Sequence, residues 1–162
     1  MLVLAYRDAM ARTDAASRVI AAPRAAVYEA FVDRDALVAW LPPAGMRGEL
    51  EVFDPRPGGS YRLTLTYLDP TEAAGKATAD TDVVEARFVA LDPGVSVVQV
   101  VEFPSDDPAF AGTMTMTWRL ADVGGGTRVD FVADGVPAGI SAEDHAAGMT
   151  SSLANLAAYL ER

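Results

Sequence analysis

Apolar and polar residues alternate through most of the chain, which is the pattern of strands that bury one face. In MRGELEVF (46–53), Met46, Leu50 and Val52 fall on one face, and the charged residues fall on the other. Segments rich in glycine, proline and aspartate separate such stretches and are typical of turns and loops. The pattern therefore predicts strands at 15–22, 46–53, 60–67, 81–91, 95–103, 113–120 and 127–134.

The segment VSVVQVVEF (95–103) is apolar on both faces, so two registers are open. One register turns Val95, Val97, Gln99, Val101 and Phe103 inward, and the other turns Ser96, Val98, Val100 and Glu102 inward. We favour the first register, because Phe103 is the bulkiest residue of the segment. Gln99 is then a buried polar group that needs a partner, and a ligand could supply it. The valines left outside indicate a homodimer contact or a crossing loop.

The period changes to that of a helix in three places. Pro23 is typical of a helix start, and Asp33 can cap a second short helix that ends before the proline pair at 42–43. Near the C-terminus, SAED (141–144) fits a capping box with aspartate in place of the preferred glutamate. Apolar residues then recur every three or four positions, which predicts an amphipathic helix of about twenty residues.

Successive strands with short breaks favour an antiparallel sheet, and an apolar sheet face must be covered. Only the last predicted helix is long enough to cover it. We therefore expect an α+β fold in which a curved antiparallel sheet of about seven strands wraps around this helix. Two short helices follow the first strand. The whole chain, 1–162, is expected to form one domain, in which residues 1–13 are flexible.

Charge and composition narrow the possible partners. The chain has 13 basic and 23 acidic residues and a net charge of -10, which disfavours nucleic acid and anionic membrane surfaces. The N-terminal apolar run is too short for a signal peptide, and no stretch reaches the twenty apolar residues of a membrane span. We expect a cytoplasmic protein without membrane insertion. The absence of cysteine, the single histidine and the absence of a dinucleotide fingerprint predict no metal and no cofactor.

Two features are candidates for chemistry, and each has a structural alternative. Gly58 and Gly59 lead into a strand rather than into a helix N-terminus, so we interpret them as a bend and not as a phosphate cradle. His145 lies on the apolar side of the last helix. It is a candidate polar group of a pocket, or a general acid or base, because histidine titrates near neutral pH. The alternative is a residue that is hydrogen-bonded to a nearby loop.

Several large or pliable side chains are expected to face inward, where they could form a lining that adapts to an apolar guest. The alternative for each of them is ordinary core packing. The residues predicted to line a ligand site are Trp40, Tyr61, Leu63, Gln99, Met114, Met116, Trp118, His145, Met149 and Leu153.

Four stretches resemble the helix-grip fold of the START-like, SRPBCC superfamily, and in particular its activator-of-heat-shock-ATPase-like (AHSA-like) branch. They are RVIAAPRAAVYEAFVDRDALVAWLPPAGM (18–46), FDPRPGGSYRLTLTY (53–67), GTMTMTWRLADVGGGTRVDF (112–131) and GMTSSLANLAAYLE (148–161). One departure is Met149, which stands where family members often carry an aromatic residue, so a flexible thioether replaces a rigid ring.

The resemblance implies a small hydrophobic or amphipathic ligand, such as a lipid or a polyketide, held between the sheet and the long helix. Gln99 or His145 would orient this ligand. Two alternatives stay open. The first is a cyclase or dehydratase acting in the same cavity, with His145 as its candidate catalytic residue. The second, implied only by the name of the branch, is a module that stimulates a chaperone ATPase.

Overall fold

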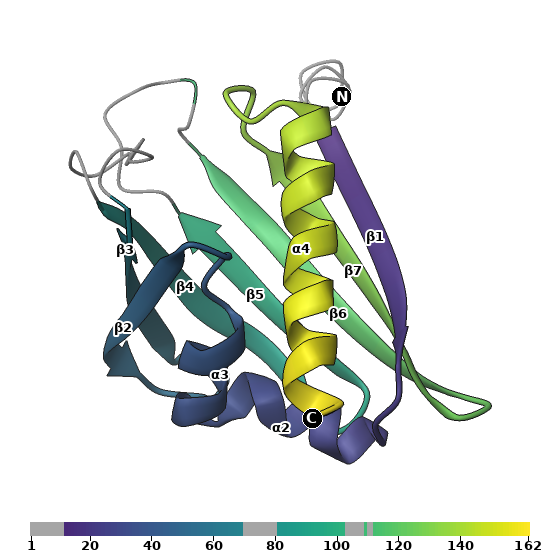
Figure 1. Ribbon diagram of the computed structural model, residues 1–162. Coiled ribbons are helices and arrows are strands. Elements are labelled where there is room, and N and C mark those ends of the chain that lie inside the picture. Colours follow the sequence, from purple (N-terminus) through teal and green to yellow (C-terminus); the bar gives the residue numbers. More distant parts are fainter. Residues whose placement is uncertain (1–11, 70–80, 103–108, 110–111) are drawn as a thin grey trace.

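The computed structural model describes residues 12–69, 81–102, 109 and 112–162. Seven strands and three helices are found in this part of the chain (Figure 1). The elements are β1 (Arg12–Ile20), α2 (Arg24–Val32), α3 (Arg34–Trp40), β2 (Met46–Phe53), β3 (Ser60–Tyr67), β4 (Thr81–Asp92), β5 (Ser96–Glu102), β6 (Thr113–Val123), β7 (Gly126–Val136) and α4 (Ala142–Leu160).

The strands form one antiparallel sheet in the order β1-β7-β6-β5-β4-β3-β2. The sheet is curved, and α4 runs across its concave side, while α2 and α3 lie at one end (Figure 1). This confirms the predicted α+β helix-grip architecture. The hydrophobic core lies between the concave face of the sheet and the three helices.

Burial alternates along the strands as the sequence pattern predicts. In β3, Tyr61 and Leu63 are buried, and in β5 the buried positions include Val97 and Gln99. The first of the two registers of β5 is therefore the one that the structure has. Phe103, on which that choice depended, lies outside the described residues.

Two valines that were predicted to face inward are exposed, each because of a local irregularity. Val52 is 50% exposed, since the register between β2 and β3 shifts after Leu50. A β-bulge of this kind reverses the alternation of the strand beyond it. Val95 is 43% exposed, because it belongs to the turn before β5, where its N–H donates to the carbonyl of Asp92 at 2.9 Å.

The predicted helix caps are present. Asp33 accepts a hydrogen bond from the backbone N–H of Ala36 at 3.0 Å, and Ser141 accepts one from the N–H of Asp144 at 3.0 Å. Helix α4 has 19 residues, close to the predicted length. Strand β1 starts at Arg12, so the last two residues of the segment 1–13 belong to the sheet, and residues 1–11 lie outside the described part.

The structure supports the interpretation of Gly58 and Gly59 as a bend. Gly58 has φ +86°, a left-handed conformation that glycine adopts readily. A Cβ on Gly59 would lie 2.1 Å from the carbonyl oxygen of Asp54, so the turn closes against its own backbone. The pair also extends the sheet, since the N–H of Gly58 donates to the carbonyl of Phe88 at 2.8 Å.

None of the helices in the described segments combines the length and the hydropathy of a membrane span.

Candidate functional site

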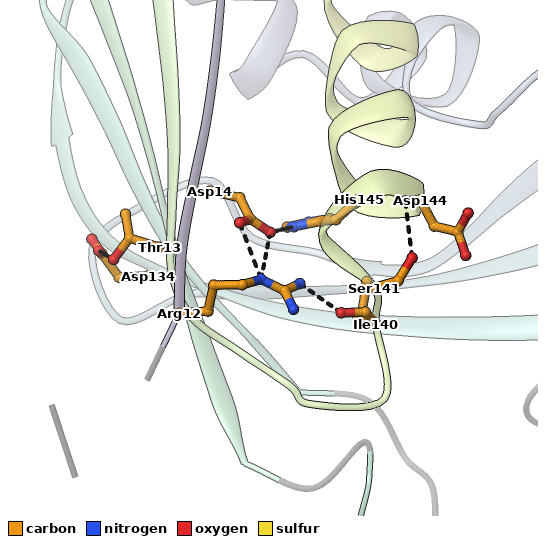
Figure 2. A network of polar contacts seen from close by, with 8 residues as sticks. All are labelled: Arg12, Thr13, Asp14, Asp134, Ile140, Ser141, Asp144 and His145. Carbon is orange, nitrogen blue, oxygen red and sulfur yellow. Dashed lines mark hydrogen bonds and ion pairs between the residues drawn. The ribbon is translucent and has the colours of Figure 1, made fainter. Parts of the chain in front are cut away.

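A polar network joins the first turn of α4 to the edge strand β1 (Figure 2). His145 Nδ1 lies 2.7 Å from Asp14 Oδ2, and Arg12 Nε lies 3.1 Å from Asp14 Oδ1. A second nitrogen of the Arg12 guanidinium donates to the carbonyl of Ile140 at 2.6 Å. The network therefore ties β1 both to the helix and to the loop before it.

The network sits on the concave face of the sheet. Asp14 pairs with the buried Ala133 of β7, and residues that are paired directly across two strands share a face. The side chains of Asp14 and His145 are only 12% and 14% exposed. The imidazole ring therefore lies in the layer between α4 and the sheet, and not on the outer surface of the helix.

Burial raises the pKa of Asp14, but the hydrogen bonds from His145 and Arg12, together with the charges of both groups, outweigh it. The net effect holds the pKa of this carboxyl below its usual value. Asp14 is therefore ionised at neutral pH and can only accept hydrogen bonds. It follows that the hydrogen between the two side chains is carried by His145 Nδ1.

The sequence pattern indicated His145 but not its partners. The predicted alternative was a hydrogen bond to a nearby loop, whereas the bond goes to a strand 131 residues away in the sequence. A signal was available in β1, RTDAASRVI, where Arg12 and Asp14 alternate with small outward residues and share a face with Ala16. Charged residues at inward positions of an edge strand need partners, which the sequence alone could not name.

Gln99 is only 2% exposed, and other side chains of the protein form hydrogen bonds with its buried amide. The indole N–H of Trp118 donates to Gln99 Oε1 at 3.2 Å. Burial raises the pKa of the Tyr61 hydroxyl, and a hydrogen bond with Gln99 partly offsets this effect. No buried side-chain nitrogen or oxygen in the described segments lacks a partner, so Gln99 does not need a ligand for that purpose.

Trp40 and Trp118 form part of a packed aromatic cluster. The ring of Trp40 lies 5.1 Å from that of Phe31 and 5.9 Å from that of Trp118, in edge-to-face arrangements. Trp118 also stacks on Phe131 at 3.6 Å, and the Trp40 indole donates to the carbonyl of Ala30 at 2.8 Å. At this end of the molecule, side chains of the protein fill the layer between the sheet and the helices, which favours core packing as the role of both tryptophans.

Met116 differs from its neighbours. It is paired with Gln99 on one side and with Ala133 on the other, so it faces inward from a central strand. Both neighbours are buried, as are Met114 and Trp118 before and after it on the same face, yet Met116 is only partly buried. Because strands cover both of its sides and its side chain points inward, we infer that its accessible surface faces the layer under α4.

The remaining predicted site residues, Leu63, Met149 and Leu153, are buried members of the same core. The structure thus places all ten predicted residues on the concave face of the sheet or on the helices packed against it. Eight of them are buried, and Met116 and His145 keep accessible surface.

The described residues also line hollows away from this layer. One of about 330 Å³ lies on the outer face of the sheet beside Arg62, Glu85 and Arg87. Two others, of about 540 and 480 Å³, lie on either side of Tyr159 near the C-terminal end of α4. Tyr61 is the one predicted site residue in their linings. Within the described segments no group of three or more histidine, aspartate or glutamate residues could hold a metal ion.

The model of the family "Activator of Hsp90 ATPase homolog 1-like protein" matches residues 21–161. A crystal structure of a protein from Chromobacterium violaceum is 32% identical, with a TM-score of 0.80 over 93% of this chain and 97% of that one. A protein from Mesorhizobium loti is 20% identical, with a TM-score of 0.72 over 93% and 98%. A protein from Mycobacterium smegmatis is also 20% identical, with a TM-score of 0.68 over 91% and 90%. The search of curated proteins finds no match to the chain.

Proposed function

The chain belongs to the family of activator of Hsp90 ATPase homolog 1-like proteins, within the START-like superfamily, and from this premise we propose that it binds a small hydrophobic or amphipathic molecule between the sheet and α4. The fold of this family is in general a ligand-binding fold. The proposal concerns the position of the guest and its apolar character.

The accessible surface of Met116 carries the proposal. An inward residue in the middle of a sheet normally touches core on every side, and a well-packed core leaves few spaces as large as a water molecule. Met116 keeps accessible surface there although every neighbour on its face is buried. A thioether also adapts its shape to different apolar partners. Both properties suit a residue beneath a guest.

The two polar groups expected to orient a guest differ in their availability. The amide of Gln99 is occupied by Trp118 and Tyr61, so it supports the wall of the layer and is a weak candidate for contact with a guest. His145 holds its Nδ1 against Asp14, while no described contact involves its Nε2. His145 is thus the better candidate for a polar contact.

The test is a titration with N-phenyl-1-naphthylamine, an uncharged apolar dye whose fluorescence rises when it leaves water. Met116→Trp adds bulk where the accessible surface lies and should weaken binding of the dye at least tenfold. Met116→Ala removes bulk and should keep the binding. The matched control is Thr117→Trp, which adds the same ring to the outer face of the same strand and should bind as the wild type does.

Equal binding of the dye by the wild type and by folded Met116→Trp protein would exclude the space beside Met116 as the site. Circular dichroism and a thermal melt establish that each variant is folded before the comparison is made.

Several finer expectations stay predictions. They are the lipid or polyketide nature of the guest, the cytoplasmic location and the homodimer. No contact among the described residues favours the cyclase or dehydratase alternative over binding. We do not propose that this chain stimulates a chaperone ATPase, the activity that the family name describes.

A further inference from the structure

His145 provides one hydrogen-bond acceptor of fixed orientation in the layer under α4. Its ring lies in that layer, because Nδ1 contacts the inward-facing Asp14 at 2.7 Å (Figure 2). Asp14 also accepts from Arg12 Nε, and the ionised carboxylate requires a hydrogen on Nδ1. In the neutral ring, Nε2 is therefore a bare acceptor of fixed orientation. No hydrogen bond among the residues that the structure describes involves Nε2.

The sheet beneath this acceptor leads directly to the accessible methionine. Asp14, Ala133 and Met116 are paired across three adjacent strands and form one row on the concave face. The middle member, Ala133, has only a methyl group and is fully buried, so a guest that spans the row must displace the protein side chains that cover it. Adjacent strands are about 4.8 Å apart, so the row from Asp14 to Met116 spans about 10 Å, the length of a small amphipathic molecule.

The charges around His145 determine which polar group of a guest can bind to Nε2. Within the network the positive Arg12 offsets the negative Asp14. Glu143 and Asp144 lie in the same first turn of α4 as His145, and the chain as a whole carries a net charge of -10. This surrounding field disfavours a carboxylate on the guest. A neutral hydroxyl avoids this repulsion and can donate its hydrogen to Nε2.

We propose that the guest carries a hydroxyl group that donates to His145 Nε2, while its apolar body contacts Met116. The ligand class is therefore an uncharged alcohol or phenol with an apolar skeleton. This inference rests on the function proposed above, since it concerns the polar end of the same site.

The first experiment compares matched probes by calorimetric titration of the full chain. They are 1-naphthol, which has the hydroxyl, 1-methoxynaphthalene, which cannot donate, and 1-naphthoate, which is charged. We expect 1-naphthol to bind about three- to tenfold more tightly than the ether, as one net hydrogen bond allows. The naphthoate should bind most weakly.

The matched variant is His145→Asn, whose amide nitrogen can keep the hydrogen bond from the Nδ1 position to Asp14 but provides no group at Nε2. It should bind 1-methoxynaphthalene as the wild type does and should lose the preference for 1-naphthol. A preference that survives in this variant would overturn the role of Nε2.

The second experiment needs no variant. His145 is the single histidine of the chain, so the ¹⁵N signals of its ring are assigned without ambiguity. For the neutral ring we expect a protonated Nδ1 and a bare Nε2, and a shift of the Nε2 signal on addition of 1-naphthol but not of the ether. A bare Nδ1, or an Nε2 signal that ignores 1-naphthol, would contradict the inference.

The failure of this inference and the failure of the proposed function give different results. If both neutral probes bind equally, and Met116→Trp removes both, the apolar site exists and only the hydroxyl contact is wrong. If neither neutral probe binds, or if Met116→Trp changes nothing, the site itself is wrong and both proposals are overturned.

Discussion

Asp14 shows how burial changes the contribution of a single ion pair to the stability of the protein. The pairs Arg12–Asp14 and Arg128–Asp130 have the same spacing, and both have Nε–Oδ1 distances of 3.1 Å. Asp130 points away from the core and is 38% exposed, whereas Asp14 is 12% exposed and also accepts from His145. Exposed ion pairs contribute about 0–1 kcal/mol, but hydrogen bonds to a mostly buried charged group contribute about 1.5–3 kcal/mol.

We therefore expect Asp14→Asn to lower the free energy of unfolding at pH 7 by about 1–3 kcal/mol. The matched Asp130→Asn change should cost less than about 1 kcal/mol. Because the pKa of Asp14 is lowered in the folded state, its contribution is complete above the unfolded value of about 3.9. It is lost as the pH falls through the folded value.

Urea unfolding of the wild type and the Asp14→Asn variant across pH 2 to 7 measures this effect. The two curves should be separated at neutral pH and should converge in acid. A separation that stays constant down to pH 2 would contradict the assignment of the effect to the ionised carboxylate.

At the scale of elements, the turn between β2 and β3 contains two adjacent glycines that are required for different physical reasons. Gly58 needs its positive φ, but a Cβ there would meet nothing within 4 Å. Gly59 has no positive φ, but a Cβ would lie 2.1 Å from the Asp54 oxygen and 3.0 Å from that of Arg56. The first is a conformational requirement, and the second is a close approach of backbone to backbone.

Gly59→Ala should therefore destabilise the protein more than Gly58→Ala. The change at Gly58 should cost about 1–2 kcal/mol, the usual penalty of a left-handed residue with a side chain. The change at Gly59 must displace backbone and should cost about 3 kcal/mol or more. Thermal melts of the two single variants make the comparison, and equal losses would show that the turn relaxes to admit the methyl group.

At the scale of the whole molecule, charge opposes compactness. The chain carries 23 acidic and 13 basic residues, so folding brings an excess of negative charge together. Several surface ion pairs, such as Arg24–Asp122 and Arg56–Asp54, act in the opposite direction, but they are exposed and individually weak. The net repulsion should outweigh them near neutral pH.

We expect the melting temperature at pH 7.5 to rise by a few degrees between about 10 and 200 mM sodium chloride, because salt screens charges beyond about 8–10 Å. The same titration near pH 4.4, the sequence pI, provides the control and should show little or no rise. A melting temperature that falls with salt at pH 7.5 would mean that the ion pairs dominate.

The sequence by itself determined the elements and the sides they bury. Two kinds of feature depend only on neighbours within a few positions, so the local sequence pattern predicts them. They are the alternation of burial in β3 and β6 and the helix caps at Asp33 and Ser141. The prediction that Val52 faces inward was wrong, because a β-bulge is an extra residue relative to the partner strand. The sequence of one strand alone does not reveal it.

Only the tertiary structure decided the partners of the polar side chains. Asp14 and His145 are 131 positions apart, and Gln99 reaches Trp118 across a strand pair, so neither contact has a local signal. Whether an inward side chain ends as packed core, as Trp40 does, or keeps open surface, as Met116 does, also depends on every element that covers it. Packing in three dimensions sets that balance, because a space exists only where no other part of the chain fills it.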